Sequence, residues 1–436
     1  MSAFVLVKVV LELRSPGGIA SPEQRHGPEG IHLPLARGPL GQTDAERLYV
    51  PASSLAGSLR AHLGDRASTL MGHAPTEEGI SASPLRFLGT RVRSAGTVQR
   101  SRTGIDRDRG AADTSKLRTG EFLNPGTRIT AYLRLDRPDL ATELFEGLRT
   151  WSPTVGRGRT NGHGHAVLVE LRHRTIDLDT PDGRRAWLTG GGPDLFADEH
   201  TEPVPISTPD GPDEPTPLLR LGWQVVDGLH VGNGEKKGEP DGPKVALLLR
   251  DHLGRPCVPG STWKGVLRSR CEFILRSLGA AACAPTDPPC RVCLVCRGFG
   301  FTGRGREVAS QRGLLVFDES TVQDAEVGRQ AHAPLDRVFG GVTDGLLFTE
   351  EVVRHGGLTL GVRRTGPVDQ TTEAHLVALL TLACHDIHHG LVGLGGSTTR
   401  GLGTLRLVGD PDDLAAQRAH AVAVLTDALA VTEETR

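Results

Sequence analysis

The sequence has no run of apolar residues that approaches the ~20 a membrane-spanning helix needs. Its first stretch, MSAFVLVKVVLELRSPGG, is apolar and alternating, and it carries neither a basic leader nor a small-residue cleavage pattern. These absences argue against a membrane span and a signal peptide, and they favour a first β-strand. We therefore expect a cytoplasmic protein without a membrane partner.

Cysteine is missing from the first 256 residues, yet seven cysteines follow, four of them in the segment CAPTDPPCRVCLVCRG. Without an export signal, such clustering favours a metal site over disulfide bonds. The spacing C-x6-C-x2-C-x2-C lets thiolates converge on one tetrahedral Zn²⁺, so we expect a structural zinc site. An iron–sulfur cluster and a redox pair are the alternatives, although no thioredoxin-like context surrounds the motif. The expected ligands are Cys283, Cys290, Cys293 and Cys296.

An excess of one charge is also missing, because 50 Lys and Arg stand against 52 Asp and Glu. A globally basic protein is thus excluded, and binding to nucleic acid would depend on local patches. The most basic segment, residues 86–118, holds nine Lys and Arg against three Asp. A hairpin of this composition suits a phosphate backbone, with salt-sensitive affinity. The alternative is a solvated insertion.

Four landmarks occur twice and in the same order, which indicates a duplicated domain. Each copy has an alternating strand, a proline-led helix start, an Asp-Arg insertion and a glycine-rich loop before a closing strand. The pairs are AFVLVKVVLEL and LLRLGWQVV, PASSLAG and PGSTWKG, GIDRDRGAADTSKLRTGEF and PLDRVFGGVTDGLLFTEE, and GRGRTNGHGHAVLVEL and GLGGSTTRGLGTLRLV.

The repeat divides the 436 residues into two domains of the α+β class. Residues 1–188 form the first domain, and residues 218–412 form the second, which carries the cysteine insertion. A Pro/Gly/acidic linker without periodicity spans 189–217, and 413–436 form a C-terminal packing helix. Each half also has a second apolar strand, IHLPLAR or VALLLRD. This order of elements suits a β-α-β-β-α-β unit of ferredoxin-like or RNA-recognition-motif (RRM) type.

The helix starts at residues 51–57 and 259–265 are candidate phosphate-binding sites. Hydroxyl residues occupy the expected N-cap positions, where a cap contributes about 1 kcal/mol. Unpaired N–H groups and a partial positive charge at a helix N-terminus attract phosphate. A following arginine either faces phosphate or pairs with an acid; the alternative is two well-capped helices without a ligand. The residues are Ser53, Ser54 and Arg60 in the first copy, and Ser261, Thr262, Lys264 and Arg268 in the second.

The glycine-rich loops VGRGRTNGHGH and GLGGSTTRGLG are a second candidate contact. Glycine allows positive φ and the close approach of another backbone, which suits a sugar-phosphate chain. Arg157, Arg159 and His163 in the first loop and Arg400 in the second can bind phosphate. The alternative is a flexible surface turn. A dinucleotide motif is disfavoured because the glycines precede a strand.

The helix phrase, the Asp-Arg insertion and the closing glycine loop together resemble the RAMP superfamily of CRISPR-associated proteins. They are most similar to backbone subunits of type III effector complexes, and the two halves resemble a tandem fusion of the type III-D-like kind. The resemblance implies RRM-like RAMP domains that bind guide RNA (crRNA) and target RNA and assemble with other subunits in antiviral defence. It also implies a structural zinc and β-hairpin thumbs at TGIDRDRGAAD and APLDRVFGGVTDG, with RNA contacts at Arg107 and Arg337.

The resemblance also indicates where target RNA would be cut. Active subunits carry an aspartate five residues before the arginine that ends the second strand, and His32 and Val245 stand at those positions here. The nearest carboxylate in the second copy is Asp241, with Glu239 beside it, and His32 is the replacement in the first. A carboxylate, or a divalent metal that it recruits, can promote attack by the ribose 2′-hydroxyl. We expect a scaffold in the first domain, and endoribonuclease activity in the second stays open.

Two other functions are compatible with the sequence. Stand-alone RAMP-family endoribonucleases that process guide RNA also duplicate this fold, and they use a histidine base near the N-terminus, for which His32 is the candidate. Such enzymes usually lack a four-cysteine motif. A zinc-binding scaffold without RNA would leave the basic segment 86–118 unexplained.

Overall fold

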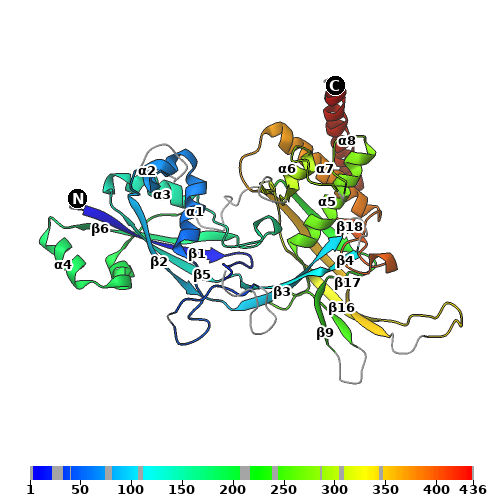
Figure 1. Ribbon diagram of the computed structural model, residues 1–436, viewed down its shortest axis with the longest axis horizontal. Helices are drawn as coiled ribbons and strands as arrows, with labels where there is room; N and C mark the ends of the chain where they lie inside the picture. Colours follow the sequence, from blue (N-terminus) through cyan, green and yellow to red (C-terminus); the bar gives the residue numbers. More distant parts are fainter. Residues whose placement is uncertain are drawn as a thin grey trace. The chain divides into compact units, whose positions relative to one another are not determined.

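The structure, a computed structural model, describes residues 3–21, 33–39, 41–73, 81–106, 111–206, 217–237, 244–284, 287–303, 309–342 and 347–434. The chain forms two compact units (Figure 1). The first comprises Met1–Arg100, Thr119–Arg159 and His163–Glu214, and the second comprises Ser101–Arg118, Thr160–Gly162 and Pro215–Arg436. Each unit combines helices with a β-sheet, which agrees with the predicted α+β class.

The first unit is built on a five-stranded antiparallel sheet. Its strands lie in the order β2 (Leu85–Arg93), β5 (Arg128–Leu135), β1 (Ala3–Leu13), β6 (Ala166–Asp177) and β7 (Glu202–Pro203). β1 occupies the centre because it is apolar on both faces, and Val7, Val9 and Leu11 are completely buried.

Two helices, α1 (Ala52–Leu63) and α3 (Ala141–Arg149), cover one face of this sheet (Figure 1). In α1 the leucines at 55, 59 and 63 recur every four residues and form one buried stripe. The short helix α2 (Ala67–Met71) follows α1, and α4 (Pro181–Thr189) follows β6.

The division between the units falls inside the predicted linker, residues 189–217. The described part of that segment differs from the prediction, because it contains a 3-10 turn at Gly192–Phe196 and strand β7. Leu195 and Phe196 are buried together with Phe4 on the second face of the sheet. Burial of this apolar pair outweighs the turn-forming composition around it.

A long hairpin follows β2 and carries most of the basic segment. Its strands, β3 (Thr97–Asp106) and β4 (Ala111–Leu123), pair as a separate two-stranded sheet. Residues Ser101–Arg118 of this hairpin are part of the second compact unit.

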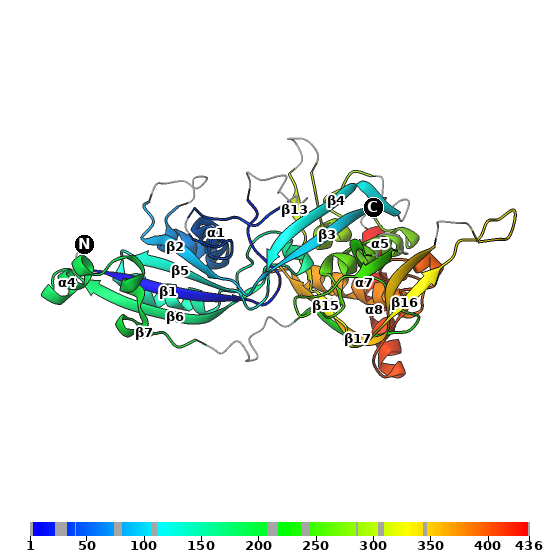
Figure 2. The same ribbon diagram turned by 90° about the horizontal axis from the view of Figure 1, so that it is seen from below.

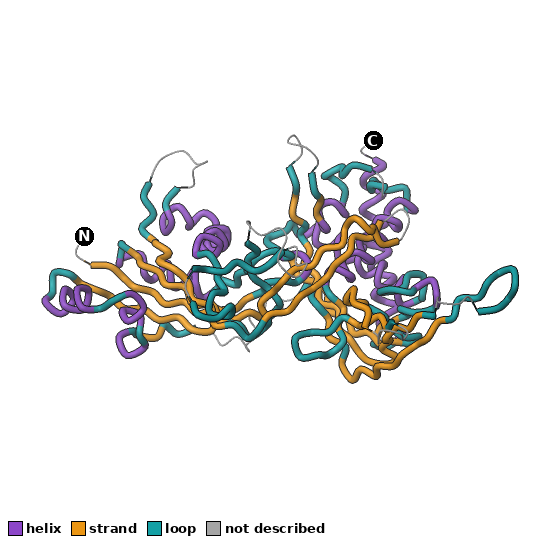
Figure 3. The backbone as a smooth tube through the Cα atoms, turned by 60° about the horizontal axis from the view of Figure 1, so that its bottom comes forward, coloured by secondary structure: helices purple, strands orange, loops and turns teal. Residues whose placement is uncertain are grey.

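The second unit is built on a seven-stranded sheet organised around the 17-residue strand β17 (Phe348–Arg364). β16 (Gln323–His332) pairs with the first half of β17 in a long hairpin (Figures 2 and 3). The other strands are β18 (Leu405–Leu407), β8 (Leu219–Val225), β10 (Val245–Leu248), β9 (Gly232–Lys237) and β14 (Leu315–Phe317). Two small sheets join β11 (Cys257–Val258) to β15 (Ser320–Thr321) and β12 (Gly300–Phe301) to β13 (Gln311–Arg312).

Helices α5 (Gly260–Ser277) and α7 (Gln370–His388) supply the core that packs on this sheet, with Trp263 and Leu379 completely buried. α6 (Leu294–Phe299) follows the cysteine motif, and α8 (Pro411–Glu434) packs on α7 through Ala421 and Leu425. α8 begins two residues before the predicted start at 413, because proline is favoured in the first turn of a helix. Among the described residues, no helix is long and apolar enough to cross a bilayer.

The sheets of the two units share an order of strands. In the first unit the sequence across the sheet is β6-β1-β5-β2, and in the second it is β18-β8-β17-β14. In both units the first strand (β1 or β8) lies between the last strand (β6 or β18) and the strand that precedes the helix α3 or α7 (β5 or β17).

Among the described residues, the predicted second strand forms in only one of the two halves. VALLLRD contains β10, but residues 33–37 of IHLPLAR make only isolated bridges, at Leu33, Leu35 and Arg37. The reason is that these three residues pair with three different segments, so no continuous ladder can form.

The same backbone hydrogen bonds attach the glycine-rich loop and the hairpin to the end of the first strand in both units. Because these bonds involve residues at matching offsets, the two loops have the same local structure. The matched bonds are Gly164 N to Pro16 O (2.8 Å) and Gly403 N to Gly228 O (2.7 Å), Arg14 N to His165 O (2.8 Å) and Val226 N to Thr404 O (3.0 Å), and Gly17 N to Leu123 O (3.1 Å) and Leu229 N to Val353 O (2.8 Å).

We expect Gly403→Ala to destabilise the second unit by about 3 kcal/mol or more, and Gly401→Ala by about 1 kcal/mol. The two glycines have nearly equal φ angles, +89° and +88°. A Cβ at Gly403 would lie 2.3 Å from the Leu394 carbonyl oxygen, whereas a Cβ at Gly401 would meet nothing within 4 Å. Urea unfolding of both variants separates the clash from the cost of positive φ. Equal losses would contradict the close approach.

Candidate functional site

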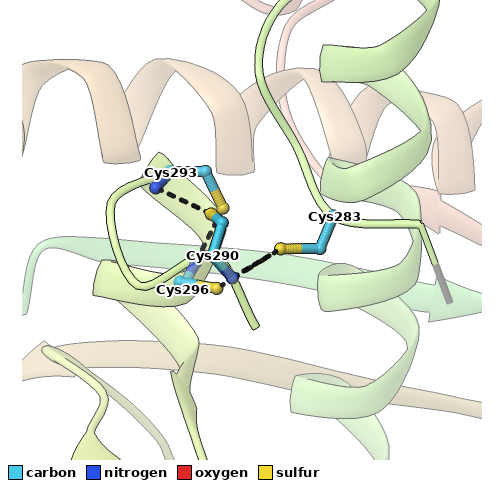
Figure 4. A group of neighbouring side chains, drawn as sticks. All are labelled: Cys283, Cys290, Cys293 and Cys296. Carbon is cyan, nitrogen blue, oxygen red and sulfur yellow. Dashed lines mark hydrogen bonds between the residues drawn. The ribbon is translucent and has the colours of Figure 1, made fainter. Parts of the chain in front are cut away.

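The four predicted ligand cysteines come together in the second unit (Figure 4). Their sulfurs all lie within 4.8 Å of one another, and Cys283 Sγ lies 3.7 Å from Cys296 Sγ. Tetrahedral zinc, with Zn–S bonds of about 2.3 Å, separates its sulfurs by about 3.8 Å. A cluster whose thiolates bind different irons needs wider spacing. The residues therefore fit a single metal ion such as zinc.

Backbone N–H groups donate hydrogen bonds to three of the four sulfurs. Cys290 N donates to Cys283 Sγ (3.2 Å), Cys293 N donates to Cys290 Sγ (3.3 Å), and Cys296 N donates to Cys293 Sγ (3.4 Å). Burial opposes ionisation of Cys290, but the N–H donors and neighbouring thiols outweigh it and lower its pKa to about 7. Cys293 is also the N-cap of α6, so the helix start fixes the ligand.

The prediction that hydroxyl residues cap the two helix starts is wrong. α1 begins at Ala52 with Pro51 as its N-cap, and α5 begins at Gly260 with Pro259 as its N-cap. In both helices the hydroxyl residues lie inside the first turn and make no capping bond, because the proline already sets the extended backbone of the cap. The residues concerned are Ser53, Ser54, Ser261 and Thr262.

The repeated arginine of the helix phrase has the same structural contact in both units. Arg60 Nη2 donates to the carbonyl oxygen of Gly72 (2.9 Å), and Arg268 Nη1 donates to that of Gly300 (2.8 Å). Each glycine is the C-cap of the next short helix, α2 or α6, where carbonyl groups lack partners. Arg268 also pairs with the buried Glu272 (3.0 Å). Both arginines are thus engaged inside the protein.

The start of α5 is in contact with protein. A Cβ on Gly260 would lie 1.9 Å from the Phe317 carbonyl oxygen and 2.6 Å from that of Asn161. Lys264 Nζ donates to Thr160 Oγ1 (2.8 Å), and residues Thr160–Gly162 are part of this unit. Burial, aided by the nearby Arg268, lowers the pKa of Lys264 to about 8.

The start of α1, in contrast, borders a pocket of about 300 Å³ in the first unit. Ser54 contributes to its wall from the helix, and Arg159 contributes from the glycine-rich loop. The two segments singled out from the sequence therefore line one groove. The complete lining is Ile19, Ala20, Ser54, Leu55, Thr154, Val155, Gly156, Arg157 and Arg159.

The glycines of the first loop are required by the protein's own backbone. A Cβ on Gly156 would lie 1.9 Å from the Gly18 carbonyl oxygen, and φ at Gly156 is +94°. Arg157 Nη2 donates to the Leu33 carbonyl oxygen (2.9 Å), and its guanidinium lies 4.9 Å from the centre of the Phe122 ring. Burial lowers the pKa of Arg157. Arg157 is thus held inward, while Arg159 remains at the groove.

His163 also has an internal role. It is 3% exposed, its Nδ1 lies 3.1 Å from the Pro16 carbonyl oxygen, and its ring stacks on Phe122 with centres 4.9 Å apart. In the second unit, φ of +59° at Ser397 shapes the corresponding loop, which carries Arg400.

A glutamate–arginine pair missed from the sequence recurs in both units. Glu121 accepts from Arg37 Nη2 (2.9 Å) and from Leu35 N (2.9 Å). The corresponding contacts in the second unit are Arg250 Nη2 to Glu351 Oε2 (3.3 Å) and Leu248 N to Glu351 Oε2 (3.1 Å). The arginine that ends the second apolar segment is therefore fixed to the strand that returns from the hairpin. This arginine ends the second apolar segment in both halves of the sequence, and that shared position is the signal that could have revealed the pair.

A buried acid–base cluster, also missed, occurs only in the second unit among the described residues. Glu350 is 3% exposed and accepts from Ser397 Oγ (3.0 Å), and His332 Nε2 lies 2.7 Å from its carboxylate. Arg400 Nη2 lies 3.7 Å and His230 Nδ1 3.9 Å from the same carboxylate. The matching position in the first unit is Gly120, where Arg157 fills the space. We call Glu350, Ser397, His332, Arg400 and His230 the Glu350 cluster.

An aromatic ring supports this cluster at the loop end of the β16–β17 ladder. His332 stacks on Phe348 with ring centres 4.7 Å apart, and the Arg400 guanidinium lies 5.4 Å from the same ring. Arg400 also donates to Ser397. These contacts hold Arg400, a predicted RNA contact, in place, and 48% of its side chain remains exposed.

The β16–β17 hairpin ends in an ordered turn that contains Arg337. Asp336 Oδ1 accepts from Val338 N and Phe339 N (both 2.8 Å), and this holds the turn together. Arg337 is exposed, and Phe339 is 88% exposed. The predicted sites His32, Arg107 and Asp241, with Glu239, lie outside the described residues.

A comparison with models of known protein families shows that residues 224–406 match the model of the RAMP superfamily. No curated protein matches the chain. The matched segment runs from the end of β8 into β18, and it contains most of the sheet, the four-cysteine cluster and the Glu350 cluster. The match covers less than half of the chain, and it makes the second unit similar to the RAMP superfamily, the family that the sequence resembles.

Proposed function

We propose that the chain is a guide-RNA-binding backbone subunit of a type III CRISPR effector, made of two tandem RAMP domains. The main observation in support of two copies of one domain is the set of matched hydrogen bonds, which recur residue for residue around both glycine-rich loops. The common strand order supports two ferredoxin-like copies, because it is the order of a β-α-β-β-α-β unit. The two hairpins would be the thumbs, and other effector subunits the partners.

The groove of the first unit is the proposed seat for guide-RNA phosphate. Ser54 and Leu55 of the first turn of α1 line this groove, so the partial positive charge of the helix N-terminus lies beside it. Arg159 adds a full charge, and Ser54 and Thr154 add hydroxyl groups. In the second unit the helix start is filled by protein, so its RNA contacts would come from Arg337 and Arg400. Arg60, Arg157, His163 and Arg268 would act by holding the loops in place.

This proposal predicts that Arg159→Ala weakens binding of single-stranded guide RNA by about tenfold at low salt. Loss of one phosphate contact should also reduce the slope of log K against log salt concentration by about 0.7. The measurement is fluorescence anisotropy with labelled guide RNA over a range of KCl concentrations. Guide RNA should also co-purify with the wild-type chain.

Arg185→Ala is the matched control. Arg185 is exposed on α4, which follows the far end of β6 from the glycine-rich loop, so the charge change is equal but remote. Equal losses in both variants would contradict the groove. Cleavage of a repeat hairpin by the isolated chain, abolished by His32→Ala, would instead support a guide-processing enzyme.

A second candidate activity, cleavage of target RNA, is favoured for the second unit alone. The Glu350 cluster supplies imidazole, carboxylate and guanidinium groups that have no counterpart in the described part of the first unit. The paired residues Lys237 and Val245 flank the segment that carries Asp241, and Val245 pairs with Thr349, next to Glu350. The β10 end of that segment therefore lies next to Glu350 in the sheet, and its β9 end lies one strand further away.

A further inference from the structure

A second pocket lies in the RAMP-matched unit, at the end of α7 and away from the residues assigned above. It measures about 790 Å³, within the about 300–1,000 Å³ of small-molecule sites. α7, β18 and α8 all contribute to its wall, and none of its lining residues is acidic. These residues are His385, His388, His389, Leu407, Gly409, Pro411, Leu414, Ala415, Arg418, Ala419 and Val422.

Three histidines gather at one corner of this pocket. Positions 385, 388 and 389 lie three and four residues apart at the end of α7, so they share one face of the helix. The ring centres of His388 and His389 are 5.0 Å apart, and that of His385 lies 6.3 Å from each.

His385 has an unsatisfied hydrogen-bonding group. The residue is 4% exposed, and its Nε2 is buried with no hydrogen-bond partner among the described residues. Buried polar side-chain atoms are rarely left unpaired, so this nitrogen indicates a missing partner in the pocket.

His388 argues against a metal ion as that partner. Its Nδ1 accepts a hydrogen bond from Leu407 N (2.9 Å), so the proton of the neutral ring lies on Nε2. A metal at Nε2 would require the opposite tautomer, with a proton on Nδ1. His388 therefore offers an N–H donor to the pocket.

Arg418 gives the pocket a positive charge that an anion would balance. Arg418 is exposed and makes no hydrogen bond or ion pair with the described residues. Burial first, then His388, His389 and Arg418, lower the pKa of His385, with Asp386 opposing them. Asp386 is itself bound to Arg270 (2.6 Å) and does not line the pocket.

The remaining wall is apolar. Leu407, Leu414 and Val422 provide it, and the flat rings of His388 and His389 lie beside them. A ligand that satisfies both parts has an anionic group and a flat, weakly polar body. Nucleotides have this combination, since phosphate suits arginine and imidazole N–H donors while a base stacks on flat rings.

We propose that this pocket binds a nucleotide, with its phosphate at Arg418 and the histidines and its base against Leu407, Leu414 and Val422. The proposal does not depend on guide-RNA binding in the first unit, because the two pockets share no residue.

The test is isothermal titration of the full-length chain with adenosine 5′-monophosphate (AMP). We expect saturable binding at one site, at least tenfold weaker for Arg418→Gln and for His385→Gln. Adenosine should bind at least tenfold more weakly than AMP because it lacks the phosphate. His420→Gln is the control, because His420 is exposed on α8, the helix of Arg418, and does not line the pocket. The affinity of this variant for AMP should stay within twofold of the wild-type value.

Circular dichroism checks that each variant is folded, and Arg418→Gln decides the outcome because its side chain is exposed. No saturable binding by the wild-type chain would overturn the proposal. Equal affinity of Arg418→Gln, or of adenosine and AMP, would also overturn it. Loss of AMP binding in Arg159→Ala, with Arg418→Gln unaffected, would assign the nucleotide to the groove of the first unit.

Discussion

Cys293→Ser is expected to abolish stoichiometric zinc in the purified chain and to unfold the region between α5 and α6. Structural zinc supplies about 10–16 kcal/mol of apparent binding free energy in zinc-finger peptides, and folding uses this energy. Here α6 is also held by core contacts of Val295 and Phe299, so we expect a loss of about 5 kcal/mol or more rather than the full amount. The measurements are metal content by mass spectrometry and the thermal midpoint of the second unit.

Serine is the sharpest replacement because a hydroxyl can still cap α6, where Cys293 now accepts from Cys296 N. The variant therefore removes the ligand and keeps the cap. Cys384→Ala is the control, since Cys384 is completely buried in the core outside the cluster. It should lose stability but retain about one zinc per chain. Full zinc content in Cys293→Ser, or iron in the wild-type protein, would contradict the assignment.

Asp241→Ala is expected to lower target-RNA cleavage by the assembled complex by about 10²–10⁴-fold, the usual contribution of one general acid–base group. Its segment connects β9 to β10, and Val245 at the start of β10 pairs with Thr349, next to Glu350. A carboxylate there can take the proton of the 2′-hydroxyl, or hold a divalent metal that would lower the pKa of the 2′-hydroxyl so that a base removes its proton more easily. The measurement is single-turnover cleavage of labelled target RNA with guide RNA bound.

Glu239→Ala is the control for this prediction because it removes a carboxylate from the same segment at a different position. Binding of target RNA must be unchanged in both variants, which separates chemistry from assembly. Cleavage at the wild-type rate in Asp241→Ala would rule out this residue. Equal losses in both variants would mean that the segment is needed for position and not for one carboxylate.

The cysteine motif and the α+β class could be predicted because each depends on local sequence. Cysteines with two residues between them converge because one turn connects them. Cys283 lies shortly after the end of α5, so a short segment is enough to bring it to the other three cysteines. The helix starts were found for the same reason, but their caps were not. Proline at 51 and 259 takes the cap position, and the serine two residues later resembles a cap in sequence.

The roles of the charged residues could not be predicted from sequence. Arg268 was equally compatible with phosphate and with an acid, and it binds Glu272 and a helix C-cap. Glu350 lies in a strand next to Glu351, and nothing in that local pattern shows which carboxylate faces His332 and Ser397. Contacts between residues far apart in sequence depend on how the strands pair.

The sequence alone determined that the chain contains two similar halves, because strand, helix start, insertion and glycine loop recur in fixed order. It also predicted that four cysteines come together where they could hold one metal ion, since residue type and spacing suffice for that. Only the tertiary structure decided that Ser54 and Arg159 line one groove, that the start of α5 is occupied by protein, and that Glu350 gathers two histidines. Burial and long-range pairing fix which polar groups meet, and neither is written in a local stretch of residues.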